Sequence, residues 1–274
     1  MINMEDAMFR DITIGQYYPT DSPIHKLDPR VKLVGTILFI ISIFIVKDFR
    51  AYVLVVGFLG AVIKLSKVPF SFMVKGLRGI IFLLLLTVVM NMFMTPGEAL
   101  VSIGPLTITD LGLKNALFMG FRLILLIIGS SVMTLTTTPN SLTDGLEKLM
   151  NPLKKIKVPV HEVSMMMSIA LSFIPILCEE TDKIIKAQTA RCADFDSKNL
   201  INKVKSYIPV LVPLFVSAFR RANDLAMAME ARCYQGGDNR TKLYPLVYSK
   251  SDKIAYAILY LYLGLLILVR FILK

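Results

Sequence analysis

The chain has 274 residues, 55% of them hydrophobic, and a formal net charge of +11. A water-soluble domain has too little interior for that share of apolar side chains, so the composition predicts an integral membrane protein. The excess of Lys and Arg is typical of cytoplasmic loops near anionic lipid, and no basic-aromatic motif indicates nucleic-acid binding.

Five apolar stretches approach the length of about 20 residues that a helix needs to cross a bilayer. They lie at residues 30–46, 49–66, 79–95, 111–135 and 254–273. The first two are short, and the second could instead be a re-entrant or interfacial helix. We therefore expect an all-α membrane protein, with four membrane helices in residues 1–135 and a fifth in residues 254–274.

The loops between these stretches predict the orientation of the chain. Residues 64–78 carry four basic residues and no acidic one, and residues 148–157 carry four lysines. Residues 95–110 carry two acidic residues and no basic one. Because basic loops stay on the cytoplasmic side, the N-terminus is expected to be cytoplasmic and residues 95–110 to lie outside.

Residues 136–253 separate the fourth and fifth apolar stretches and predict three cytoplasmic helices. These helices are expected at about 139–151, 159–194 and 206–235. Thr138 can cap the first, and Pro139 suits its first turn. Each of the other two is apolar in its first half and amphipathic in its second half. Pro175 is expected to bend or break the second helix, and Gly236-Gly237 to stop the third.

The second and third of these helices resemble each other. Ala190-Arg191-Cys192 lies near the end of one, and Ala231-Arg232-Cys233 near the end of the other. The distance from Pro175 to Arg191 is 16 residues and that from Pro209 to Arg232 is 23. The difference of seven residues is about two helical turns, so the two arginines keep a similar face.

Two interpretations of these arginines compete. An arginine in the last turn of a helix is favoured anyway, because it complements the negative end of the helix dipole. Its repetition between small residues favours contact with a partner, since guanidinium pairs bidentately with carboxylates and small neighbours allow close approach. Two matched helix tips predict two similar partner surfaces.

These motifs carry a family resemblance. The paired Ala-Arg-Cys segments, together with Leu-Asp-Pro-Arg-Val-Lys-Leu at 27–33 and Thr-Pro-Asn-Ser-Leu at 138–142, resemble the transmembrane T component of energy-coupling factor (ECF) transporters, the EcfT family. In that family two cytoplasmic coupling helices each end in a small residue, an arginine and a small residue, often Ala-Arg-Gly. The cysteine in the third position is a departure from that pattern.

The resemblance implies a non-catalytic, multi-pass subunit of a prokaryotic plasma membrane. It would bind two ABC-type ATPases, which would carry the ATP and Mg, and a substrate-binding S component that selects a vitamin or other micronutrient. Ala190, Arg191 and Cys192 would dock on one ATPase, and Ala231, Arg232 and Cys233 on the other. The apolar half of the second helix would contact the S component, through Met165, Met166, Ile169 and Phe173. The chain itself would bind no cofactor or metal, and it has no P-loop sequence.

Two alternatives belong to other functional classes. A membrane-embedded Mg-dependent transferase would need aspartate clusters, for which Asn223-Asp224 and Asp194-Phe195-Asp196 are the nearest candidates, but neither is part of a repeated Asp-rich motif. A self-sufficient permease predicts inverted repeats and polar groups at the membrane midplane, whereas the repeat here lies in the predicted cytoplasmic helices. Arg122, inside the fourth stretch, would line a pathway or contact the S component, or else pair within the interior or lie nearer the membrane interface. The second interpretation is favoured.

Overall fold

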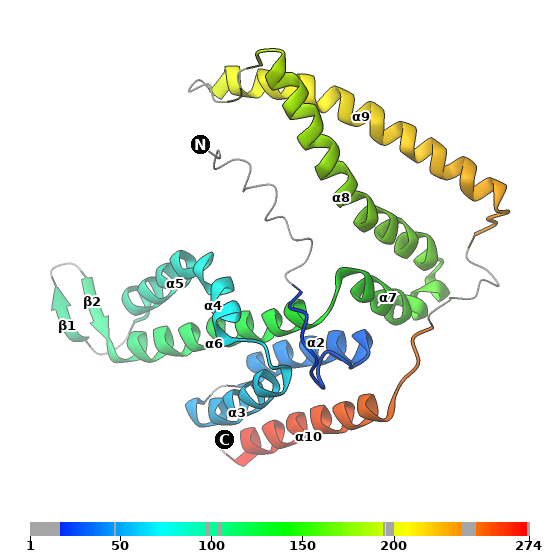
Figure 1. Ribbon diagram of the computed structural model, residues 1–274. Helices are drawn as coiled ribbons and strands as arrows, with labels where there is room; N and C mark the ends of the chain where they lie inside the picture. The colour runs from blue at the N-terminus through cyan, green and yellow to red at the C-terminus, as the bar shows by residue number, and fades with distance from the viewer. Residues whose placement is uncertain are drawn as a thin grey trace. The chain divides into compact units, whose positions relative to one another are not determined.

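The computed structural model describes residues 17–46, 48–96, 99–103, 106–193, 195, 200–236 and 245–272 (Figure 1). Its elements are α2 (Pro29–Ile45), α3 (Phe49–Ser66), α4 (Phe70–Arg78), α5 (Ile81–Met94), β1 (Ala99–Ile103), β2 (Leu106–Thr109), α6 (Asp110–Thr136), α7 (Pro139–Met150), the 3-10 helix η1 (Asn151–Ile156), α8 (Val160–Ala190), α9 (Leu200–Ala231) and α10 (Lys250–Ile272).

The chain divides into two compact units, which are described separately. Gly15–Leu149 and Leu246–Lys274 form the first, which we call the membrane unit. Met150–Pro245 belongs to the second, which we call the arginine unit because it contains both arginine motifs. Helix α7, expected with the other two cytoplasmic helices, lies in the membrane unit up to Leu149.

The expected all-α membrane class is confirmed. By length and composition α3, α6, α8 and α10 could each cross a membrane, and α4 with α5, which meet at a bend of 66°, could form a fifth span. Helix α2, with 17 residues, is as short as the sequence indicated. Helix α8, predicted as cytoplasmic, satisfies the same span criteria over its 31 residues.

Three local features differ from the expectations. The stretch 79–95 is preceded by a separate short helix, α4, and followed by an antiparallel hairpin of β1 and β2. Helix α8 runs through Pro175 and is not broken there. Helix α9 begins at Leu200, earlier than predicted, and ends at Ala231, before the glycines that were expected to stop it. Of those, Gly237 lies outside the described residues.

Helix α6 is at the centre of the membrane unit, where it packs against α2, α3, α4 and α5. Close approach to α2 depends on Gly129, since a Cβ there would overlap the ring of Phe39. The pairing favoured for Arg122 is present in the structure: its Nη2 donates to the carbonyl oxygen of Val46, 3.2 Å away. Val46 is the C-cap of α2, so the guanidinium complements the negative end of that helix.

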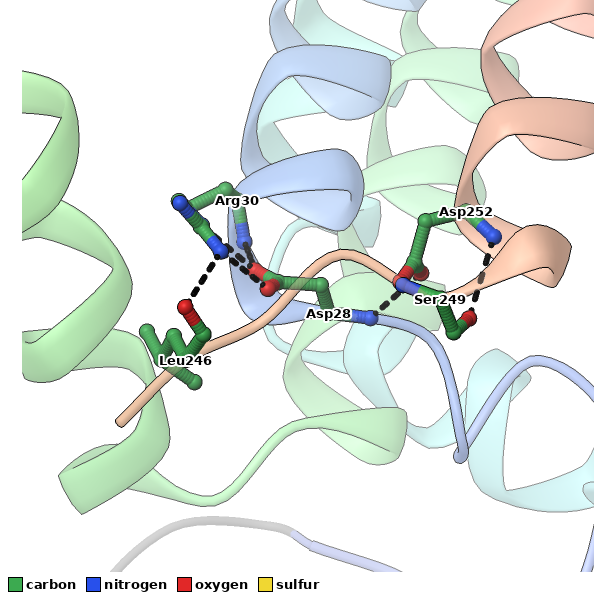
Figure 2. A network of polar contacts seen from close by, with 5 residues as sticks. All are labelled: Asp28, Arg30, Leu246, Ser249 and Asp252. Carbon is green, nitrogen blue, oxygen red and sulfur yellow. Dashed lines mark hydrogen bonds and ion pairs between the residues drawn. The ribbon is translucent and has the colours of Figure 1, made fainter. Parts of the chain in front are cut away.

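A polar network joins the beginnings of α2 and α10 (Figure 2). At the start of α10 the Ser249 N–H donates to Asp252 Oδ2 at 2.7 Å, and the Asp252 N–H donates to Ser249 Oγ at 3.3 Å, which is a reciprocal capping box. The other carboxylate oxygen, Asp252 Oδ1, accepts from the Asp28 N–H at 2.8 Å. One buried carboxylate therefore holds two segments 224 residues apart.

Asp28 and Arg30 complete this network. Asp28 is the N-cap of α2 and accepts from the Arg30 N–H at 2.9 Å, while Arg30 Nη2 lies 2.6 Å from Asp28 Oδ2. Arg30 also donates to the Leu246 carbonyl at 3.1 Å and stacks on the ring of Tyr248. Burial alone would raise the pKa of the Asp28 carboxyl, but hydrogen bonds from Arg30 outweigh it and lower that pKa below its ordinary value.

Candidate functional site

The first arginine motif terminates α8 in a defined backbone geometry. Arg191 is the C-cap, and Cys192 follows with φ +65°. The Cys192 N–H donates to the Thr189 carbonyl at 2.9 Å, and the Ala193 N–H donates to the Gln188 carbonyl at 3.1 Å. This pair of bonds is the Schellman motif, in which a left-handed residue directly follows the helix cap.

The second arginine motif repeats this geometry bond for bond. The Cys233 N–H donates to the Glu230 carbonyl at 2.8 Å, and the Tyr234 N–H donates to the Met229 carbonyl at 3.0 Å. Cys233 has φ +56°. The third position of each motif is therefore the left-handed one, where glycine is the usual residue because it has no Cβ.

Both arginines extend into open space at these helix ends. Arg191, Cys192, Arg232 and Cys233 are all exposed. Within the described part of the chain, neither guanidinium has a hydrogen bond or an ion pair. An exposed guanidinium with five free donors, held at a rigid helix end between small residues, is suited to pairing with an acceptor on another molecule.

Helices α8 and α9 are antiparallel, and side chains link them. Glu180 of α8 accepts from Arg221 Nη2 at 2.6 Å and from Ser217 Oγ at 2.9 Å, both on α9. Gln188 Nε2 donates to the Pro209 carbonyl at 3.4 Å. Residues later in α8 thus meet residues earlier in α9.

One of these links has a cause in the sequence of α9. Pro213 has no N–H, so the carbonyl four residues earlier, that of Pro209, loses its usual partner inside the helix. Gln188 supplies a donor to that same carbonyl. A neighbouring helix therefore replaces the missing bond, and α9 continues through both of its prolines.

The antiparallel arrangement separates the two arginines. With Gln188 beside Pro209, Arg191 lies near the beginning of α9, whereas Arg232 follows its last residue. Arg191 is three residues beyond Gln188 and is therefore level with about residue 206 of α9. From there to Arg232 is roughly 26 residues, or about 40 Å at the rise of an α-helix. The structure therefore assembles each Ala-Arg-Cys motif at its own helix end but does not bring the two motifs together.

The other residues singled out from the sequence have the following places. Met165, Ile169 and Phe173 recur at every fourth position of α8 and are half-buried, while Met166 is exposed. Asn223 and Asp224 are exposed on α9. Asp194 and Asp196 lie outside the described residues. Among those that are described, no group of three or more His, Cys, Asp or Glu side chains is arranged to hold a metal ion.

Sequence reasoning missed the residues that anchor α10 and link α8 to α9. Ser249 and Asp252 have the Ser-x-x-Asp spacing of a capping box directly before an apolar run, so this signal was available. The partner of Asp252 near residue 28 was not available from any local pattern. Neither was the pairing of Gln188 with the Pro209 carbonyl.

Comparison with known proteins agrees with the motifs. The family CbiQ, described as cobalt transport protein, matches residues 20–243. An energy-coupling factor transporter transmembrane protein EcfT of Clostridium kluyveri is 55% identical over 250 residues, covering 90% of this chain and 93% of the relative. EcfT proteins of Ruminiclostridium cellulolyticum (49% identical, 97% and 99% covered) and Bacillus subtilis (47% identical, 96% and 100% covered) are also similar.

Proposed function

The chain belongs to the CbiQ family and groups with the EcfT transmembrane proteins, and from this we propose that it is the coupling subunit of an energy-coupling factor transporter. In this function it binds two ABC-type ATPases and one substrate-binding S component in a prokaryotic plasma membrane. It transmits the movement of the ATPases to the S component, which delivers a vitamin or another micronutrient. The chain performs no chemistry of its own.

The observation that carries this proposal is the pair of equivalent, unpaired arginine tips. Arg191 and Arg232 follow helices with the same terminal hydrogen bonds and are exposed. Their separation of about 40 Å along α9 is too great for a single groove. Two equal tips at two distant points fit two copies of one kind of partner, each offering acceptors for a guanidinium.

The links between α8 and α9 support transmission of movement. Glu180, Gln188 and Arg221 join α8 to α9. A displacement of the arginine at the end of one helix therefore also acts on the other helix. A change in spacing between the two ATPases would therefore alter the crossing of α8 and α9 rather than move one helix alone. These polar links join the two helices along their length, so a movement of one helix is passed to the other.

The surface of α9 supports docking of an apolar membrane partner. Its exposed large apolar side chains recur at helical spacing along one stripe, which comprises Ile201, Val204, Ile208, Leu211, Val212, Phe215 and Phe219. A continuous apolar stripe of this kind marks a contact with lipid or with another protein. We assign this stripe of α9 to the S component, in addition to the separate set Met165, Met166, Ile169 and Phe173 near the beginning of α8.

The test is recovery of the ATPases with the purified chain. The chain would be co-expressed with its two candidate ABC ATPases and isolated in detergent, as wild type and as the double variant Arg191→Ala/Arg232→Ala. Removal of each guanidinium would leave its acceptors on an ATPase buried and unpaired. We therefore expect the affinity for the ATPases to fall by about 100-fold or more. The single variants should each lose one ATPase contact and give partial recovery.

The matched control is Lys186→Ala/Arg220→Ala, which removes one exposed basic residue from each of the same two helices. It should leave recovery of the ATPases unchanged. Equal recovery with the arginine double variant and with wild type would overturn the proposal. Equal loss in both double variants would also contradict it, since general charge and not the helix tips would then hold the complex.

A further inference from the structure

Two adjoining hollows open in the membrane unit beside the starts of α2 and α10. The first, of about 580 Å³, has a polar mouth lined by Asp21, Lys26, Lys67 and Ser251. The second, of about 180 Å³, is an apolar slot between α2, α3, α6 and α10. Both hollows are lined by Ile24, Leu27, Ala255 and Ile258. The two hollows therefore adjoin, and we call them together the joined cavity, which has a charged end and an apolar end.

The charged end presents two lysines. Lys67 is the left-handed C-cap of α3 and is exposed, and no carboxylate of a described residue lies within 4.0 Å of its amine. Lys26 lies 3.5 Å from Asp21, but both side chains are largely exposed, at 73% and 94%. Such a pair is weak in water and leaves the lysine available to a stronger anionic partner.

The apolar end is lined mainly by hydrocarbon. Phe39, Phe58, Val62 and Leu259 are among its walls. There is free space beside Gly35, where a Cβ would meet nothing nearer than Leu259 Cδ2 at 4.0 Å. Lys32 also lines the slot, but its amine already donates to the carbonyls of His25 and Thr136 at 3.1 and 2.8 Å.

We propose that this joined cavity binds one anionic phospholipid, with the phosphate between Lys26 and Lys67 and part of an acyl chain in the slot. A soluble anion would use only the mouth, and a neutral apolar molecule only the slot. A helix of a partner protein, about 10 Å wide and 30 Å long, is far too large for the slot. Both lysines lie on the side of the membrane unit that the basic loops predict to be cytoplasmic, where anionic lipids are concentrated.

The experiment measures lipid bound to the purified full-length chain by native mass spectrometry during titration with phosphatidylglycerol or phosphatidylcholine. The wild type should prefer phosphatidylglycerol. Lys26→Gln/Lys67→Gln should bind phosphatidylglycerol about thirtyfold more weakly, since each lysine near an anionic headgroup contributes to the attraction. The control Lys64→Gln/Lys148→Gln removes the same charge from the same predicted side and should bind it as wild type does.

Two further variants examine the other parts of the cavity. Ala255→Phe fills the junction of the two hollows and should weaken binding of phosphatidylglycerol while leaving both lysines in place. Asp21→Asn removes the negative charge at the mouth and should strengthen binding of phosphatidylglycerol. Thermal unfolding without added lipid reports whether each variant is folded, and the Ala255→Phe and Asp21→Asn results decide the matter if the double lysine variant does not fold.

Three outcomes would overturn the proposal. An equal loss of phosphatidylglycerol binding in both double lysine variants would mean that the lipid is attracted to the charged surface in general and not to this cavity. Equal binding of phosphatidylcholine would mean an apolar groove with no headgroup selectivity. Displacement of the lipid by inorganic phosphate at equal concentration would mean an anion site that makes no use of the slot.

Discussion

The two units of this chain differ in how much of their apolar surface they bury. In the membrane unit, buried side chains from α2, α3, α6 and α10 form one continuous core that includes Ile43, Val55 and Leu266. In the arginine unit the buried apolar side chains of the described residues are Val160 and Val210, while most large apolar residues of α9 are exposed. Both units expose apolar surface, as on α5 of the first, but only the first has an extensive core among the described residues.

The same contrast holds for polar groups. The membrane unit uses buried polar groups as internal links, as in the joining of α2 to α10 by Asp252, which is 2% exposed. The arginine unit leaves Arg191 and Arg232 exposed and unpaired within the described chain. We therefore expect mutations of polar groups to affect stability in the first unit and assembly in the second.

The largest difference in stability between the two units is expected from Asp252→Ala in the membrane unit. The change leaves the backbone N–H groups of Asp28 and Ser249 without their acceptor. Since each buried unpaired donor is costly, we expect a loss of about 2–4 kcal/mol in the free energy of unfolding of the membrane unit. Thermal unfolding in detergent measures it.

Ser251→Ala, an exposed change in the same helical turn, serves as the control and should be neutral. Removing the exposed link of the arginine unit by Arg221→Ala should affect stability much less, because its side chain is 41% exposed. A comparable loss in both units would contradict the contrast drawn between them.

The next effect comes from introducing a valine into each unit. Gly129→Val forces a side chain into the ring of Phe39 and should destabilise the membrane unit by about 1–3 kcal/mol. Gly57→Val, on α3 with open space around it, controls for the helix propensity of valine. Ala228→Val, exposed on α9, should leave the melting temperature nearly unchanged.

ATPase recovery gives the second measurement for these variants. Ala228 lies one turn before Arg232 on the same face of α9, so its enlargement should weaken docking of the ATPase. A stable Gly129→Val protein, or an Ala228→Val protein that melts early but binds normally, would break the comparison.

The smallest effect is a gain. Cys192 and Cys233 hold left-handed backbone conformations with φ +65° and +56°, which are unfavourable for a residue with a Cβ. Cys192→Gly and Cys233→Gly should each stabilise a helix end by about 0.5–1 kcal/mol. Slower amide hydrogen exchange at residues 188–193 and 229–234 would show it. Faster exchange there would mean that the cysteine side chains contribute contacts of their own.

The structure also shows what the departure from the family pattern, cysteine in the third position of each motif, means for the backbone. The position of these cysteines was visible in the sequence, but the sequence did not show which residue of each motif adopts the left-handed conformation. The structure places the cysteine there, after the arginine cap. Replacement of glycine by cysteine thus changes the cost of the turn while the arginine keeps its place.

The membrane class, the approximate spans and the helix ends with their arginines could all be predicted from sequence patterns. Each depends on neighbouring residues: the length of an apolar run, Thr138 capping α7 through the Ser141 N–H, or a repeated Ala-Arg-Cys motif. The local rule for prolines did not decide the helix bounds: α8 is not broken at Pro175, and Pro209 and Pro213 lie inside α9. Part of the reason, Gln188 beside the Pro209 carbonyl, lies on another helix.

How distant segments meet became visible in the folded chain alone. The bond between Asp28 and Asp252, the pairing of Arg122 with the end of α2, and the antiparallel register of α8 and α9 all join residues far apart in the chain. No local pattern encodes such pairings, because they depend on how whole helices pack. That register separates Arg191 from Arg232 by about 40 Å, and so turns two similar sequence motifs into two separate docking points.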